Sequence, residues 1–235
     1  MRLIFYFILI PALLPVFIIL RYVYKKDRIE REPLGLVLKV FILGAFFALP
    51  CIPVERVLGT IITTSFSYDE RLCSLTENIF GVALVEEFFK WLVLMIFIWK
   101  NNNFDYRYDG IVYAVTSSLG FAAIENVMYI ISYGTGVSIG RAIFAIPGHA
   151  TFGVFMGYFL SRAKHFKNKK WGFFKIIYLV LSIGVSVVIH GIYDFMLSDY
   201  SVKSGLNSYF VVYVIILDVF AWLTIRHEFK TDKSL

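Results

Sequence analysis

The chain has 235 residues, of which 59% are hydrophobic, 18% aromatic and only 17% charged. One soluble core of this length cannot bury so much apolar material, so the composition excludes a soluble globular protein and indicates a polytopic membrane protein. The formal net charge of +6 is mostly a topology signal. Its basic loops can contact anionic lipid, and nothing in the pattern gives a reason to expect nucleic acid as a partner.

Seven stretches are long and apolar enough to cross a bilayer, because a membrane helix needs about 20 residues. In chain order they cover residues 3–24, 34–54, 78–99, 110–132, 142–161, 172–197 and 208–226. The first has no small-residue cleavage site and basic residues follow it, so we expect a retained span. The sequence predicts an all-α bundle of about seven transmembrane helices that forms one domain over residues 1–235.

Lysine and arginine are distributed unevenly over the connections between these spans. One side carries sixteen of them, in the loops at 21–33, 100–109 and 162–175 and in the C-terminal tail, whereas the other side carries five. The richer side of a membrane protein usually faces the cytoplasm. We therefore expect the N-terminus outside and the C-terminus inside the cell.

Two cysteines, Cys51 and Cys73, fall near the outer ends of the second and third predicted spans. A disulfide and a pair of buried free thiols are both consistent with these positions. Two cysteines alone give neither a metal framework nor an evident nucleophile at this depth.

The third predicted span contains "EEFFK", which places Glu86, Glu87 and Lys90 in an otherwise apolar run. Each ionisable group near the bilayer centre costs about 2.5 to 3.5 kcal/mol on insertion scales, so three of them indicate a function. Glu86 and Lys90 stand four residues apart and share a helix face, where the ammonium can hold a carboxylate ionised. Glu86 and Glu87 differ by about 100° around the helix, so only one of them can point fully at a site.

The next three spans also carry polar groups, within "GFAAIENVMY", "IPGHATFGVFMGYF" and "VVIHGIYDFM". These are Glu125 and Asn126, then His149, then His190 and Asp194. Each leading residue lies about seven residues from the outer end of its span, which corresponds to a depth of about 10 to 12 Å. Helices that run in opposite directions then bring these groups into one layer with Glu86.

Such a layer contains the parts of a hydrolytic site. One glutamate can activate a water molecule while the two histidines donate hydrogen bonds to a developing oxyanion. Asp194 stands four residues after His190, so it can accept from one ring nitrogen and fix the tautomer that the other presents.

These motifs resemble those of the PrsW family of bacterial intramembrane proteases, which is related to the CAAX prenyl endopeptidase and Abi superfamily. The resemblance rests on E-E-x-x-K at 86–90, F-x-x-x-E at 121–125, the isolated His149 in a glycine-rich span, and H-x-x-x-D at 190–194. It covers about residues 78–197. The order of the motifs in successive spans makes the set more specific than any one of them.

The resemblance implies a glutamic-type endopeptidase of the bacterial plasma membrane. For such a mechanism we expect no cofactor, with zinc as the alternative. Its partner would be a single-pass membrane protein, such as an anti-sigma factor, cut next to the membrane on the extracytoplasmic side. By motif position the catalytic residues would be Glu86, Glu87, Glu125, His149 and His190, and the supporting residues Lys90, Asn126 and Asp194.

Other chemistries remain open at the level of sequence. His149, His190, Glu86 and Glu125 could instead bind zinc, although no helix carries H-E-x-x-H. Asp194 and Asp218 could form an aspartyl pair, and "GVSIG" at 136–140 matches G-x-S-x-G without the strand that a nucleophile elbow needs. The buried charges could also belong to a non-catalytic scaffold or a proton-coupled transporter, but the chain lacks a transporter's repeated broken helices.

Overall fold

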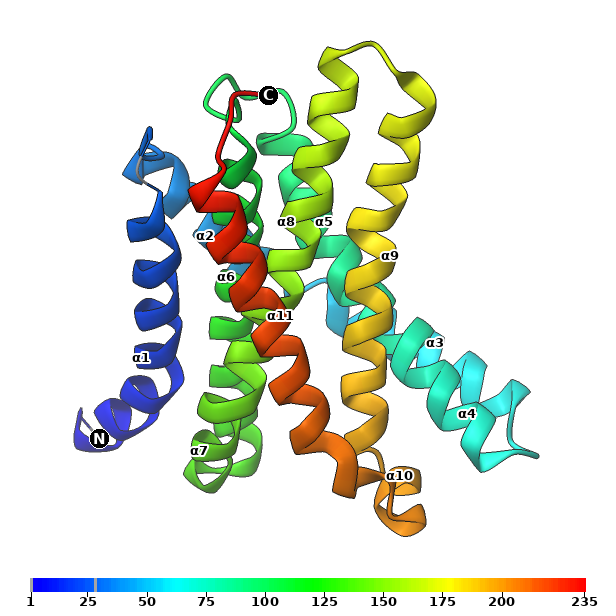
Figure 1. Ribbon diagram of the computed structural model, residues 1–235. Helices are drawn as coiled ribbons and strands as arrows, with labels where there is room; N and C mark the ends of the chain where they lie inside the picture. Colours follow the sequence, from blue (N-terminus) through cyan, green and yellow to red (C-terminus); the bar gives the residue numbers. More distant parts are fainter. Residues whose placement is uncertain (1, 28) are drawn as a thin grey trace.

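The structure is a computed structural model that describes residues 2–27 and 29–235. Over these residues it is built of helices, with a single isolated backbone bridge between Tyr106 and Ser234 (Figure 1). The α-helices are α1 (Arg2–Lys26), α2 (Leu34–Phe47), α3 (Cys51–Ser65), α4 (Glu70–Thr76), α5 (Leu84–Phe97), α6 (Arg107–Tyr133), α7 (Ser138–Gly140), α8 (Ile146–Asn168), α9 (Gly172–Leu197), α10 (Asp199–Ser204) and α11 (Phe210–Lys230).

Two π-helical segments join some of these α-helices into longer, continuous helices. Segment η1 (Glu77–Ala83) joins α4 to α5, and η3 (Arg141–Ala145) joins α7 to α8. Each ends a few residues before a motif that the sequence singled out, and π-bulges are frequent at functional sites. Pro147 lies in the first turn of α8, directly after η3. Because it has no N–H, it cannot donate to a carbonyl of the preceding helical turn, so the hydrogen-bond ladder is interrupted where the π-helix changes to α-helix, just before His149.

Five helical stretches in the described part of the chain are long and apolar enough to cross a membrane. They are Leu34–Ser65, Arg107–Tyr133, Thr135–Asn168, Gly172–Leu197 and Leu206–Lys230. The prediction of an all-α membrane bundle is confirmed. The count of seven spans and the orientation stay predictions.

The second predicted span, 34–54, differs from the structure. Helix α2 ends at Phe47, and after a turn that contains Pro50 the chain continues as α3 as far as Ser65. Proline cannot donate a backbone hydrogen bond, so α2 does not run straight on through residue 50. Helices α3 and α4 project together from one side of the bundle (Figure 1). The predicted boundary at residue 54 therefore falls inside a helix.

Helix α6 forms the centre of the bundle and packs against α8, α2 and α1. Glycines allow the close contacts. A Cβ atom on Gly157 of α8 would overlap the backbone of Gly110, and one on Gly120 of α6 would overlap the backbone of Phe41 in α2. Small residues at such crossings let helix backbones approach closely in membranes.

The two ends of the bundle collect different connections. The α1–α2 and α8–α9 connections lie at the same end as the C-terminus, while the N-terminus, α7 and α10 lie at the opposite end (Figure 1). Helices α5, α6, α8 and α9 run between these ends and carry the polar residues that interrupt the predicted spans.

Candidate active site

The structure brings the intramembrane polar residues of four helices into one cluster. Helix α5 contributes Glu86, Glu87 and Lys90, α6 contributes Glu125 and Asn126, α8 contributes His149, and α9 contributes His190 and Asp194. The single layer expected from sequence therefore exists. The catalytic roles of its members stay predictions.

Lys90 is the centre of the cluster and is fully buried. Its Nζ lies 3.0 Å from Glu86 Oε2 and 2.7 Å from Glu87 Oε1. The same atom lies 2.9 Å from His149 Nδ1 and 4.4 Å from the centroid of the Phe121 ring. A lysine ammonium has three N–H donors, and Glu86, Glu87 and His149 use all of them. Lys90 thus links the helix of the glutamates to the helix of His149.

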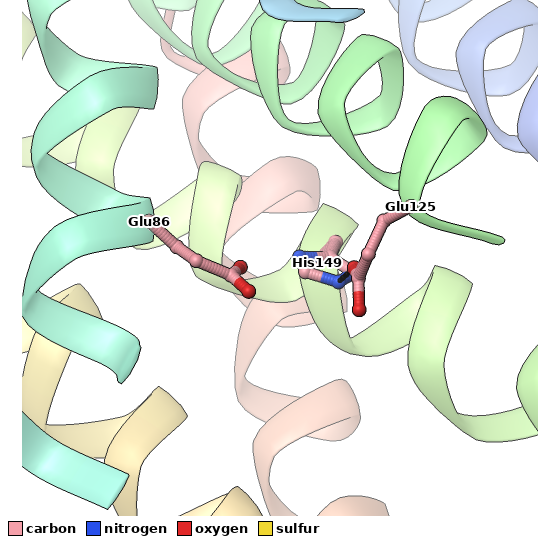
Figure 2. Close-up of side chains that lie close together, drawn as sticks. All are labelled: Glu86, Glu125 and His149. Atoms are coloured by element: carbon pink, nitrogen blue, oxygen red, sulfur yellow. Dashed lines mark ion pairs between the residues drawn. The ribbon is translucent and has the colours of Figure 1, made fainter. Parts of the chain in front are cut away.

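His149 connects Lys90 to Glu125. Because an ammonium group only donates, His149 Nδ1 accepts from Lys90, and the hydrogen of the neutral ring is then on Nε2. That nitrogen lies 2.7 Å from Glu125 Oε2. Figure 2 shows His149 beside Glu125, with Glu86 reaching toward the same space from the opposite side.

His190 lies between two carboxylates. Its Nδ1 is 2.9 Å from Glu87 Oε1, and its Nε2 is 3.2 Å from Asp194 Oδ2. The expected contact between His190 and Asp194 is therefore present. The ring stacks on Phe152 with 4.6 Å between centroids, so both hydrogen bonds and an aromatic face fix its orientation.

Arg141 also belongs to the cluster, although in the sequence it is only one of the five basic residues on the predicted outer side. Its Nη2 lies 2.9 Å from Glu125 Oε1, and its Nε donates to Asn126 Oδ1 at 2.8 Å. Its guanidinium also lies 3.8 Å from the centroid of the Tyr129 ring. In the sequence, the one indication of this role was its position at the outer end of a predicted span, next to the span that carries Glu125.

A cavity of about 680 Å³ opens beside the cluster. Its polar lining consists of Asn78, Glu86, Glu125, Arg141, His149, His190, Asp194 and Ser198, and Phe144, Tyr193 and Phe210 are among its apolar walls. Glu87 is fully buried and does not line the cavity, whereas Glu86 does. This difference answers which of the adjacent glutamates faces the site: Glu86 faces the cavity, and Glu87 lies behind it and holds Lys90 and His190.

A second cavity of about 470 Å³ adjoins the first and shares Asn78, Val82 and Ser198 with it. Its other walls come from the α3–α4 connection, α4, η1 and the start of α10. These elements lie toward the end of the bundle that is opposite the C-terminus (Figure 1). The second cavity therefore lies between that end of the bundle and the cavity that Glu86 lines.

Two groups of donors in the cluster could hold a metal ion. One consists of Glu86, Glu125 and His149, the other of Glu86, Glu87 and His190, and within each group the donor atoms lie within 4.8 Å of one another. Carboxylate oxygen and imidazole nitrogen are donors that catalytic zinc takes, so the residues fit this metal chemically. From sequence, His149, His190, Glu86 and Glu125 could together bind one zinc ion. In the structure the two histidines belong to different donor groups, so these four residues do not form a single ligand set.

The rival sites considered from sequence do not form in the described part of the chain. Asp218 accepts from Thr151 Oγ1 at 2.7 Å and lines a different cavity from Asp194, so the aspartyl pair is wrong. Ser138 lies in a short helix and donates to a backbone carbonyl, so it is not the nucleophile of a strand-to-helix elbow. Cys51 and Cys73 are both free thiols.

Comparison with known proteins gives a consistent result. The sequence model described as "PrsW family intramembrane metalloprotease" matches residues 32–222. Protease PrsW of Oceanobacillus iheyensis is 41% identical over 194 residues, which cover 83% of this chain and 84% of the relative. Protease PrsW of Geobacillus kaustophilus is 37% identical over 76% of this chain and 74% of its own length. Protease PrsW of Bacillus subtilis is 32% identical over 97% of this chain and 96% of its own length. No solved structure matches the chain significantly.

Proposed function

The chain belongs to the PrsW family of bacterial intramembrane proteases, and we propose that it is a glutamic-type endopeptidase in which Glu86 activates the attacking water. Family membership makes the chain a membrane-embedded peptidase of the bacterial cell membrane.

The observation that carries the mechanism is the position of Glu86. This carboxylate lines the cavity, while Lys90 Nζ holds its Oε2 at 3.0 Å from the buried side. Glu86 would remove a proton from water as the oxygen of that water bonds to the scissile carbonyl carbon. The same proton then passes to the amide nitrogen as the C–N bond breaks, which leaves a carboxylic acid and an amine.

N–H groups around the cavity would stabilise the oxyanion formed in this step. His149, His190 and Arg141 all line the cavity that Glu86 faces. Glu125 contacts both His149 and Arg141 while Asp194 contacts His190, so the histidine N–H groups would be shared between these carboxylates and the oxyanion. Arg141 also has N–H donors on Nη1, beyond those that contact Glu125 and Asn126. Donors oriented before the reaction stabilise developing charge without the cost of reorganisation.

Glu87 and Lys90 would act as positioning residues. Glu87 Oε1 contacts both Lys90 Nζ and His190 Nδ1 and lies away from the cavity. Lys90 in turn contacts Glu86 and His149. A change at either residue would displace both the base and the oxyanion donors.

For the substrate we propose a single-pass membrane protein, such as an anti-sigma factor, cut near its extracytoplasmic membrane boundary. The second cavity supports an approach from the end of the bundle that carries α10. An extended peptide covers about 3.3 Å per residue, so three or four residues reach a site about 10 to 12 Å below the surface. A bond in the middle of a lipid-embedded helix would first have to expose unsatisfied backbone groups.

A zinc-dependent mechanism is the second candidate, favoured by the family description and by the donor group of Glu86, Glu125 and His149. Those three residues would hold the ion, which supplies a Lewis acid for the carbonyl and a more acidic bound water. Lys90 opposes this arrangement, because its ammonium lies 3.0 Å from Glu86 and 2.9 Å from His149. A second cation on the same ligands would be repelled, so we favour the glutamate mechanism.

The experiment is cleavage of a purified single-pass substrate by the purified enzyme in detergent, with and without a strong chelator. The glutamate mechanism predicts full activity with chelator and loss of activity in Glu86→Gln. Activity that disappears with chelator and returns with stoichiometric zinc would establish the metal mechanism instead. If the wild type cleaves no single-pass substrate, the proposed substrate class is wrong.

A further inference from the structure

We propose that Asp27, Glu32 and Asp109 form a binding site for an oxygen-preferring divalent cation, Mg²⁺ or Ca²⁺, at the C-terminal end of the bundle. We call these three residues the acidic triad. Asp27 follows α1, Glu32 precedes α2, and Asp109 lies in the first turn of α6. One oxygen from each residue lies within 4.8 Å of the others, and each residue is at most 4% exposed.

Unsatisfied oxygens point to a ligand in the triad. Both carboxylate oxygens of Asp27, together with Oδ1 of Asp109, are buried and have no hydrogen-bond partner. Within residues 2–27 and 29–235, no lysine, arginine or histidine forms an ion pair with any of the three carboxylates. Buried carboxylates normally have such partners, because an isolated buried charge is costly.

The other oxygens of the triad are held in place by the protein. Asp109 Oδ2 accepts from the backbone nitrogens of Tyr106 at 2.6 Å and Asp105 at 3.0 Å. The hydroxyl of Tyr113 donates to the Glu32 carboxylate. These contacts orient Asp109 and Glu32 and leave Oδ1 of Asp109 for a ligand, as is typical of carboxylates that coordinate an ion.

The donor chemistry selects the kind of cation. All three ligands are carboxylates, which Mg²⁺ and Ca²⁺ prefer, whereas the catalytic cluster also offers imidazole nitrogen. Burial raises the pKa of Asp27 to about 6 and that of Glu32 to about 7, which shows how costly their charge is in the protein alone. A divalent cation would offset this cost and complete its coordination with water.

A cation here would connect segments that are distant in sequence. It would tie the α1–α2 connection to the start of α6, where the C-terminal tail also attaches. Arg107 N donates to Lys233 O at 3.1 Å, Tyr108 N donates to Asp232 Oδ1 at 3.1 Å, and Leu235 N donates to Asp105 O. The site would therefore stabilise the bundle at this end.

The triad is separate from the catalytic cluster, although α6 contributes to both. Asp109 and Glu125 are sixteen residues apart on this helix, which corresponds to a distance of about 24 Å along its axis. The inference therefore does not depend on the proposed protease mechanism.

The test uses the full-length protein, purified in detergent and stripped with chelator. Mg²⁺, Ca²⁺ and, as a spectroscopic probe, Mn²⁺ are titrated separately, with binding followed by calorimetry and thermal unfolding by tryptophan fluorescence. The variant is Asp27→Asn, which keeps the shape of a side chain whose oxygens have no protein partner. The matched control is Glu30→Gln, an exposed acid in the same connection. Glu86→Gln serves as the control for binding at the catalytic cluster.

We expect saturable binding of one cation and a higher unfolding temperature in the wild type, because a ligand of the folded state stabilises it. Asp27→Asn should weaken binding roughly tenfold or more, whereas Glu30→Gln and Glu86→Gln should bind as the wild type does. If Asp27→Asn does not fold, Glu32→Gln provides the same comparison. The absence of saturable binding, equal binding in the wild type and the triad variants, or loss of binding only in Glu86→Gln would overturn the proposal.

Discussion

Two groups of buried carboxylates share helix α6, and they differ in how the protein balances their charge. In the catalytic cluster, Lys90 contacts Glu86 and Glu87, and Arg141 contacts Glu125. In the acidic triad, no basic side chain among the described residues forms an ion pair with the three carboxylates. Buried charges are tolerated when they are paired or bind an ion, so this difference supports the two proposals, that the first group performs chemistry with its own cations and that the second binds a cation.

The largest expected effect is at the residue that faces the cavity. Glu86→Gln keeps the shape of the side chain but removes the base, so we expect at least a roughly hundredfold lower cleavage rate. Measurement of the initial rate with a purified single-pass substrate checks this, and circular dichroism confirms that the variant is folded. Wild-type activity in Glu86→Gln would remove this residue from the mechanism.

Glu87→Gln separates a base from a positioning residue. We expect a loss of about tenfold or more, smaller than for Glu86→Gln, because Glu87 acts through Lys90 and His190. Rate against pH provides the additional readout: in Glu87→Gln the profile should shift, because His190 loses one of its carboxylate partners. An unchanged profile together with an unchanged rate would contradict the positioning role.

Lys90→Met tests the internal cation directly. The change leaves the carboxylates of Glu86 and Glu87 without their buried partner, which should cost about 3 to 5 kcal/mol in the free energy of unfolding and abolish most activity. The control is Lys25→Met, because Lys25 is exposed in the last turn of α1, and we expect a change within about 0.5 kcal/mol. Equal stability of the two variants would mean that the cluster does not need Lys90.

Arg141 gives a smaller and more specific expectation. Arg141→Gln removes the ion pair with Glu125 and a donor at the cavity, so we expect a loss of roughly tenfold in cleavage rate with the fold retained. Arg141→Lys keeps the charge but loses the two-point contact with Glu125 and Asn126, and it should recover only part of the rate. Full activity in Arg141→Gln would place this residue outside the site.

Much of the catalytic cluster could be predicted because its members interrupt apolar spans. Glu86, Glu125, His149 and His190 each stand out at a depth where polar groups are costly, so their meeting was foreseeable. Which of Glu86 and Glu87 faces the cavity could not be predicted, because it depends on how α5 is rotated against its neighbours.

The remaining features gave weaker signals in the sequence. Arg141 lies at the end of a span, where basic residues are ordinary, so its inward direction could not be distinguished from an interfacial one. The acidic triad was missed because Asp27 and Glu32 lie in a connection and Asp109 follows much later in the chain. Only the packing of α1 and α2 against α6 brings these three residues together.

The most direct test of the central claim is cleavage by metal-depleted enzyme, with metal content measured on the same sample and the new termini of the product mapped by mass spectrometry. We predict that the wild type without zinc cuts a single-pass substrate within a few residues of its extracytoplasmic membrane boundary, and that Glu86→Gln does not. Cysteine labelling of the connections at 25–33 and 162–170 should locate both in the cytoplasm. A strict requirement for zinc, or a cut on the cytoplasmic half of the substrate, would contradict the account.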